Sequence, residues 1–232
     1  MKTIGLIGEM SWESPAEYYR LVNEETRRHL GGMHSARIVP YSFVFADIDE
    51  LPQAGAWERA SGLLAEATRV LERAGAELLV LCTNTMHRLF DDIEAGVSVP
   101  FIHIADPTAE GVRAEGLGTL GLLGTRYTME GDFSLRRLKE RHGLSSLIPD
   151  EPDRSMVHDI IYGELVVGVI RDESRQRYRK AIVDLVARGA QAIVLGCPEI
   201  GLLIDSHDAP VPVFDSTRLH AQAAVAAALT MP

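Results

Sequence analysis

The chain has 232 residues, a formal net charge of −10 at pH 7, 46% hydrophobic residues and two cysteines. This length suits two small domains of about 110 residues each, and the apolar content allows each a buried core. The acidic balance argues against nucleic-acid binding, which requires Lys and Arg patches. Because no stretch of 18 apolar residues occurs, we expect no membrane span. We expect the two thiols to be reduced and cytoplasmic, since the start carries no signal-peptide pattern.

Short apolar runs alternate with amphipathic segments of helical length. The first helix begins at Ser14-Pro15-Ala16-Glu17, which combines a capping box with proline at the first helical position, and it ends at Gly31-Gly32. The predicted strands, in chain order, are residues 3–8, 36–45, 78–82, 101–103, 119–123, 146–148 and 192–195. The further predicted helices are residues 57–73, 85–94, 108–114, 129–142, 154–167, 173–188 and 215–229. This alternation indicates an α/β fold with mostly parallel sheets.

The C-terminal half of the sequence echoes the N-terminal half. Gly5-Leu6-Ile7-Gly8 recurs as Gly121-Leu122-Leu123-Gly124, and residues 75–83 resemble residues 189–197. Self-similarity of this kind indicates two copies of one structural unit. We therefore predict two similar domains, each a mostly parallel sheet flanked by helices, related by a pseudo-twofold axis with the active site between them.

The first domain boundary is predicted near Ala105-Asp106-Pro107, and we expect the last helix to return to the first domain. The predicted domains are residues 1–105 plus 215–232, and residues 106–214. Aligning the two repeats places Thr83 on Cys197 and Cys82 on Gly196.

The segment Cys82-Thr83-Asn84-Thr85 follows a predicted strand and leads into a predicted helix. Open α/β sheets bind ligands at the carboxyl ends of their strands. The free amides of the following helix would hold an anion such as a carboxylate, and Asn84 and Thr85 would add side-chain donors. The alternative is a helix cap made of Thr and Asn, which requires no ligand.

The segment Gly196-Cys197-Pro198-Glu199 occupies the equivalent strand end. A helix N-terminus here could lower the pKa of the Cys197 thiol, whereas the alternative is a small buried hydrophobic residue. Alignment with Thr83 makes Cys197 the preferred candidate for chemistry. Cys82 is predicted to be the last buried residue of its strand.

Other motifs carry less information. The segment 8–14 ends the first strand and can offer backbone amides and the Ser11 hydroxyl to an anion, or form an ordinary strand-to-helix turn. His87 and His103 are predicted to be hydrogen-bonded structural histidines. The sequence contains no His-x-x-x-His and no paired cysteines, so no metal site is expected. The glycines of segment 116–121 precede a strand instead of opening a helix, which argues against a dinucleotide site.

Together these motifs resemble the aspartate/glutamate racemase family of cofactor-independent amino-acid racemases. The resemblance is carried by residues 8–14, 81–87, 100–106, 123–129 and 196–201. It implies an isomerase that needs no pyridoxal phosphate or other cofactor and uses a two-base mechanism, with one acid/base residue from each domain. The first directly precedes an Asn-Thr pair, which here makes it Thr83. The second lies in a Gly-Cys-Thr-Glu motif, which here makes it Cys197.

The resemblance also implies a substrate, an assembly and a location. Family members bind the substrate carboxylate with residues that match Met10, Ser11, Asn84 and Thr85. They are commonly homodimers, and we expect this chain to be cytoplasmic. A branch of the family with threonine in the first position favours L-amino acids, and this chain resembles that branch.

Three residues depart from the family pattern. Glu9 replaces the second glycine of Gly-Gly-Met-Ser, which puts a carboxylate beside a carboxylate-binding turn. Pro198 replaces the usual threonine after the second cysteine and removes a hydroxyl and an amide donor. Val167 stands where aspartate racemases carry the lysine that holds the distal carboxylate of the substrate, so acidic substrates are not favoured.

The sequence therefore predicts an amino-acid racemase in which Cys197 and Thr83 act on opposite faces of the α-carbon. Because a threonine hydroxyl is too weakly acidic to be a free base near neutral pH, two alternatives stay open. One is a single-thiol decarboxylase or cis-trans isomerase on the same fold, and the other is a degenerate protein that only binds a small carboxylate. The predicted partner in each case is a small molecule, with no nucleic acid and no membrane.

Overall fold

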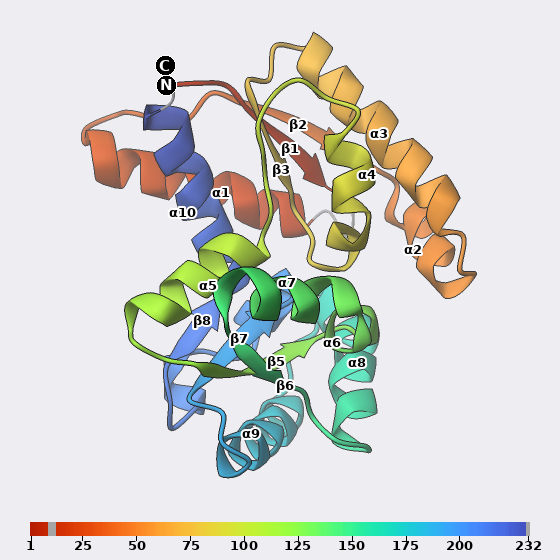
Figure 1. Cartoon of the computed structure of the whole chain (residues 1–232), viewed down its shortest axis with the longest axis vertical. Helices are drawn as coiled ribbons and strands as arrows, with labels where there is room; N and C mark the ends of the chain where they lie inside the picture. Colours follow the sequence, from red (N-terminus) through yellow and green to blue (C-terminus); the bar gives the residue numbers. More distant parts are fainter. Residues whose placement is uncertain (9–12, 231–232) are drawn as a thin grey trace. The chain divides into compact units, whose positions relative to one another are not determined.

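Figure 1 shows the computed structural model of the chain, which describes residues 1–8 and 13–230. The chain divides into two compact units. Unit 1 contains Met1–His103 and His220–Pro232, and unit 2 contains Ile104–Leu219. No helix within the described residues has the length and hydrophobicity needed to cross a membrane.

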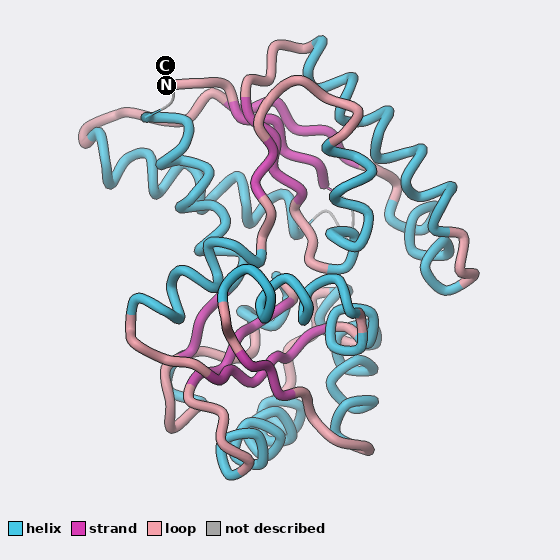
Figure 2. The backbone as a smooth tube through the Cα atoms, viewed as in Figure 1, coloured by secondary structure: helices cyan, strands magenta, loops and turns pink. Residues whose placement is uncertain are grey.

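Unit 1 is built on a four-stranded parallel sheet in the order β2-β1-β3-β4. Its strands are β1 (Ile4–Gly8), β2 (Ile38–Ser42), β3 (Leu78–Leu81) and β4 (Phe101–Ile102). Its helices are α1 (Glu13–Leu30), α2 (Phe45–Gln53), α3 (Trp57–Arg73), η1 (Thr85–Leu89), α4 (Phe90–Glu94) and most of α10 (Ser216–Thr230). Figure 2 shows the strands of this unit lying together, with helices on both sides of the sheet.

The apolar character of β1 and β3 is explained by cover on both faces. Successive side chains of a strand point to opposite faces. Ile7 and Leu79 therefore join one core with α3, whereas Leu6 and Val80 join a second core with α1 and α10. The return of α10 beside α1 brings the C-terminal helix into unit 1.

Unit 2 repeats this architecture with a parallel sheet in the order β6-β5-β7-β8. Its strands are β5 (Thr119–Gly124), β6 (Ser145–Leu147), β7 (Ala192–Gly196) and β8 (Val213–Asp215). Its helices are α5 (Ala105–Ala114), α6 (Arg126–Glu130), α7 (Asp132–His142), α8 (Asp153–Gly163), η2 (Leu165–Val167), α9 (Asp172–Ala187), η3 (Pro198–Leu202) and η4 (Ser206–Asp208). Ile193 packs in a core with α8 and α9, and Val194 packs in a core with α5 and α7.

The predicted fold class, two similar α/β domains with parallel sheets flanked by helices, is confirmed within each unit. Several boundaries were wrong. The predicted helix 129–142 is two helices, because the backbone of Gly131 is extended (φ −75°, ψ 121°) and separates α6 from α7. The predicted strand 36–45 ends at Ser42, and α2 begins at Phe45. The short strand β8 was not predicted.

Candidate functional site

The two sheets place Thr83 and Cys197 at equivalent positions of their units. β1 pairs with β3 so that Gly5 lies opposite Leu79, and β5 pairs with β7 so that Gly121 lies opposite Ile193. The two pairings are equivalent, because the sequence repeat aligns Gly5 with Gly121 and Leu79 with Ile193. Thr83 is four residues after Leu79, and Cys197 is four residues after Ile193. Each residue follows the carboxyl end of the strand next to the first strand of its unit, which is where open α/β sheets bind ligands.

Thr83 lies in a tight, buried turn between β3 and η1. Its residue exposure is 1%, and the neighbouring Asn84 and Thr85 are also buried. The Thr83 carbonyl oxygen accepts a hydrogen bond from Nδ1 of His87 at 2.6 Å. The turn is therefore held by a side chain from the following helical segment.

The predicted anion-binding helix after Thr83 is shorter than expected. The predicted helix 85–94 is a five-residue 3₁₀ helix, η1, followed by α4. Since few peptide dipoles align in so short a helix, its N-terminus contributes little to holding an anion. Asn84 makes no side-chain capping hydrogen bond to η1, so the structure does not support its assignment as a helix cap.

Cys197 directly follows β7 and is 3% exposed. Its Sγ donates a hydrogen bond to Oε2 of Glu199 at 2.9 Å, and Glu199 is 1% exposed. Burial, followed by the charge of Glu199, raises the pKa of the Cys197 thiol well above its ordinary value. The raised pKa favours the protonated thiol, whose Sγ is directed at the Glu199 carboxyl group.

Of the two possibilities that the sequence left open for Cys197, a lowered thiol pKa is contradicted, whereas a small buried residue agrees with its 3% exposure. The helix that follows is η3, which has only five residues and begins with Pro198, a residue without an N–H group. The backbone of Glu199 does provide a hydrogen bond that lowers the Cys197 pKa, but burial and the Glu199 carboxylate outweigh it. The pairing of Cys197 with Glu199 was not predicted, although the spacing of two residues across a strand end was visible in the sequence.

Cys197 also packs among apolar side chains. Cys197 belongs to the core cluster that contains Ile200 and Tyr178. Burial, together with the nearby Cys197 and Glu164, raises the pKa of Tyr178 well above its ordinary value, and its hydroxyl donates to the Val157 carbonyl at 3.1 Å. The thiol therefore lies in a buried, largely apolar environment where electrostatic interactions are strong.

The other predicted site residues fall in different places. Met10 and Ser11, like Glu9, lie outside the described residues. Val167 is 66% exposed and ends η2, directly before Gly168, whose φ of 72° is left-handed. Cys82 is fully buried as predicted, but it follows β3, which ends at Leu81, instead of belonging to the strand. Its carbonyl accepts a hydrogen bond from the Ser14 hydroxyl at 2.5 Å.

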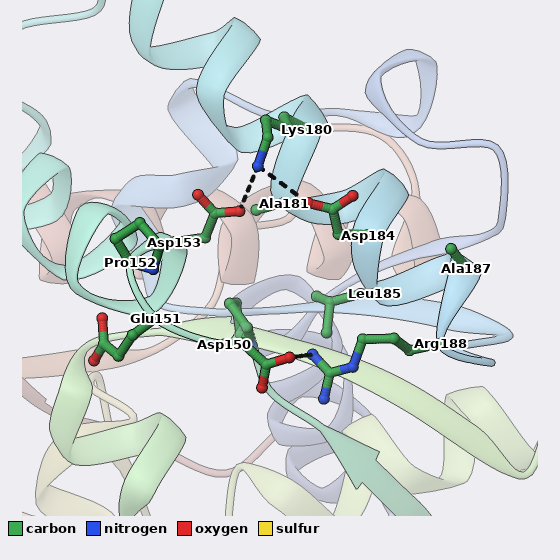
Figure 3. A pocket seen from close by; sticks show the side chains of 11 residues that line it. Asp150, Glu151, Pro152, Asp153, Lys180, Ala181, Asp184, Leu185, Ala187 and Arg188 are labelled. Atoms are coloured by element: carbon green, nitrogen blue, oxygen red, sulfur yellow. Dashed lines mark hydrogen bonds and ion pairs between the residues drawn. The ribbon is translucent and has the colours of Figure 1, made fainter.

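A pocket of about 430 Å³ on unit 2 is lined by none of these residues (Figure 3). Lys180 pairs in it with Asp153 at 2.9 Å and with Asp184 at 3.2 Å. Arg188 pairs with Asp150 at 3.2 Å. Because both cations that line this pocket are neutralised by carboxylates, it is poorly suited to a carboxylate substrate. Within residues 1–8 and 13–230, no group of three or more His, Cys, Asp or Glu side chains is arranged to hold a metal ion.

Comparison with known proteins identifies a family. The model of the Asp/Glu/Hydantoin racemase family matches residues 7–224 of the chain. A Yersinia pestis structure described as a candidate Asp/Glu racemase is 50% identical, with a TM-score of 0.92 over 99% of this chain and 100% of that one. An aspartate racemase homologue from Pyrococcus horikoshii OT3 is 33% identical, with a TM-score of 0.86 over 99% of this chain and 100% of that one.

A more distant match is the broad specificity amino-acid racemase RacX of Bacillus subtilis (strain 168). It is 21% identical over 159 residues, which are 67% of this chain. The matched region spans 66% of the length of that relative.

Proposed function

Because the chain belongs to the Asp/Glu/Hydantoin racemase family, and is thereby an isomerase of the amino-acid racemase type, we propose that Cys197 and Thr83 carry its reaction. Cys197 removes the α-proton of an amino acid on one face, and Thr83 returns a proton on the other. The observation that supports this assignment is the common register of the two sheets, which gives each unit one such residue at the same strand end.

The first step requires the Cys197 thiolate, whereas the resting residue is a thiol bonded to Glu199. We propose that substrate binding resolves this conflict through the α-ammonium group. At an effective dielectric constant of 20, a unit positive charge about 4 Å from the sulfur would favour the thiolate by about 4 kcal/mol. Glu199 would attract that ammonium and keep the thiol protonated until it arrives. The thiol proton would then pass to a water molecule that enters with the substrate, which leaves the thiolate to accept the α-proton.

The second step forms and quenches a carbanion. The electron pair of the broken C–H bond stays on the α-carbon and spreads into the carboxylate, whose charge must be stabilised as it grows. Asn84 and Thr85 follow Thr83 directly, and we propose that they bind this carboxylate together with Met10 and Ser11. Since general acid–base catalysis contributes only about 10²- to 10⁴-fold, positioning and electrostatic stabilisation must supply most of the rate.

The two directions should differ in rate. The Cys197 thiol can lose its proton once the ammonium group is bound, but the Thr83 hydroxyl is far too weak an acid to form a free base near neutral pH. Thr83 can still donate a proton to a carbanion, with water replacing it. L-amino acids should therefore lose their α-proton faster than D-amino acids.

We propose that the substrate has a neutral or basic side chain. The exposed Val167 offers no charge to a distal carboxylate, and the chain as a whole is acidic. The homodimeric state and the cytoplasmic location are proposals that sedimentation and cell fractionation would test.

The test is an NMR screen for exchange of the α-proton with deuterium from D₂O over L- and D-amino acids. Exchange supports the racemase proposal, and its absence with every amino acid contradicts it. Release of carbon dioxide or isomerisation of a double bond would favour the single-thiol alternative. Binding without any reaction would favour the small-carboxylate binding protein.

A further inference from the structure

Three histidines of unit 1 form one buried cluster beneath the Thr83 turn. His87 comes from η1, His103 follows β4, and His220 lies on α10; all three are buried. The ring centroid of His87 lies 4.6 Å from that of His103 and 5.7 Å from that of His220. Three segments far apart in the sequence therefore meet directly behind a proposed catalytic residue.

Main-chain carbonyl groups fix how two of these rings are protonated. A carbonyl oxygen can only accept, so Nδ1 of His87 must carry the hydrogen that it donates to Thr83 at 2.6 Å. In the same way, Nε2 of His220 donates to the Ile102 carbonyl at 2.9 Å. Nδ1 of a neutral His220 then accepts from the Tyr18 hydroxyl at 2.8 Å.

The ring of His87 is also held by packing. Phe90 stacks on it with an interplanar angle of 8° and a centroid distance of 5.7 Å, and His103 meets it edge-on. A side chain buried between such neighbours has little freedom to rotate. The donor that faces the Thr83 carbonyl is therefore a rigid one.

We propose that His87 is a positioning residue for Thr83, an inference that rests on the proposed racemase function. The peptide group after Thr83 is planar, so fixing its carbonyl oxygen fixes the end of the Thr83 main chain and the start of Asn84. This orients the Thr83 hydroxyl toward one face of the α-carbon. Catalysis depends strongly on such placement, because displacements of about 1 Å can cost about 10²-fold in rate.

The consequence is stereochemical and concerns only one of the two faces. In D₂O, Cys197 alone can exchange the α-proton of an L-amino acid with retention of configuration. Inversion additionally requires Thr83. Loss of the His87 hydrogen bond should therefore lower the ratio of inversion to retentive exchange, whereas a general loosening of the fold would lower both rates together.

Two substitutions separate the hydrogen bond from the bulk of the ring. In His87→Asn the side-chain amide nitrogen lies close to the position of Nδ1 and can donate to Thr83, whereas His87→Leu removes the donor. We expect His87→Leu to lower the ratio of inversion to retentive exchange about tenfold, because a buried carbonyl that has lost its donor costs free energy of that order. His87→Asn should keep this ratio near the wild-type value. Phe101→Leu is the matched control, because Phe101 packs on Phe90 in the same core and makes no ring contact with His87.

The experiment follows inversion and retention separately, by chiral chromatography of the deuterated product. A wild-type ratio in His87→Leu, or an equal fall in Phe101→Leu, would overturn the inference. If His87→Leu does not fold, His87→Gln replaces it. The amide nitrogen of glutamine is one bond further from the main chain than that of asparagine. The ratio of inversion to retentive exchange should therefore be lower in His87→Gln than in His87→Asn, and equal ratios would overturn the inference. A wild type that exchanges no α-proton would instead contradict the proposed function, and with it this role of His87.

Discussion

Replacing Glu199 with glutamine should make Cys197 more reactive toward an alkylating agent. The thiol donates to the Glu199 carboxylate at 2.9 Å, and both side chains are buried. After burial itself, the charge of Glu199 is the largest cause that raises the Cys197 pKa. A glutamine removes that charge and can donate a hydrogen bond to the thiolate, so both effects of the change favour ionisation.

The size of the effect follows from the geometry. Sγ and Oε2 lie 2.9 Å apart, and two unit charges even about 4 Å apart interact by about 4 kcal/mol at an effective dielectric constant of 20, which is about a thousandfold in an equilibrium constant. A thiol with an ordinary pKa of about 8.5 is only about 3% ionised at pH 7, and a raised pKa lowers this fraction further. We therefore expect alkylation of Cys197 at pH 7 to become roughly 10- to 1000-fold faster in Glu199→Gln.

The assay is alkylation by iodoacetamide between pH 7 and 9, with Cys197 modification read by peptide mass spectrometry. Because steric access to Cys197 is similar in the wild type and in Glu199→Gln, the ratio of their alkylation rates reports the difference in thiol ionisation. Asp184→Asn, which removes a surface charge from the same unit, serves as the control and should leave the rate unchanged. Slower alkylation in Glu199→Gln would show that Glu199 is the base that ionises the thiol, and would refute the account in which it keeps the thiol protonated.

Three further predictions follow from the two strand ends and η2. Thr83→Cys places a thiol, with a reference pKa of about 8.5, where a hydroxyl stood, so D-to-L turnover should rise by more than L-to-D turnover when both are assayed by chiral chromatography. If Thr83→Cys leaves the D-direction unchanged and Thr83→Ala leaves the L-direction unchanged, Thr83 has no catalytic role. Cys82→Ser should keep its exchange activity but lose about 1–3 kcal/mol of unfolding free energy, measured in urea, because it buries a hydroxyl. Equal catalytic loss in folded Cys82→Ser and folded Cys197→Ser would contradict the alignment of the repeats. Aspartate and glutamate should be weaker competitors than neutral amino acids because Val167 is uncharged, and efficient aspartate turnover would contradict this.

The fold could be predicted where burial on both faces left a clear sequence pattern. The continuous apolar runs of β1, β3, β5 and β7 are such cases, and their repetition predicted two units. Short or half-exposed elements leave a weaker pattern. β8 has three residues, two of them only partly buried, and α2 contains Pro52, which argues against a helix. Tertiary packing decides the structure of both.

From the sequence, the site could be predicted only where the spacing of residues determines their position in the fold. The repeat aligned Thr83 with Cys197, and the sheet registers have the same alignment. The protonation state of Cys197 could not be predicted, because it depends on the direction in which the Glu199 side chain turns. The contact between His87 and the Thr83 carbonyl was missed for a related reason. A spacing of four residues is common in helices, but only the structure shows that this ring turns back toward the strand end.

The most direct test of the central claim is α-proton exchange in D₂O, measured by NMR for the wild type and for Cys197→Ser with the best L-amino acid from the screen. The substitution changes one sulfur to oxygen, so the fold should be retained, which circular dichroism would verify. If Cys197 is the catalytic base, the wild type exchanges the α-proton and folded Cys197→Ser does not. Wild-type exchange rates in Cys197→Ser would show that Cys197 is not the base.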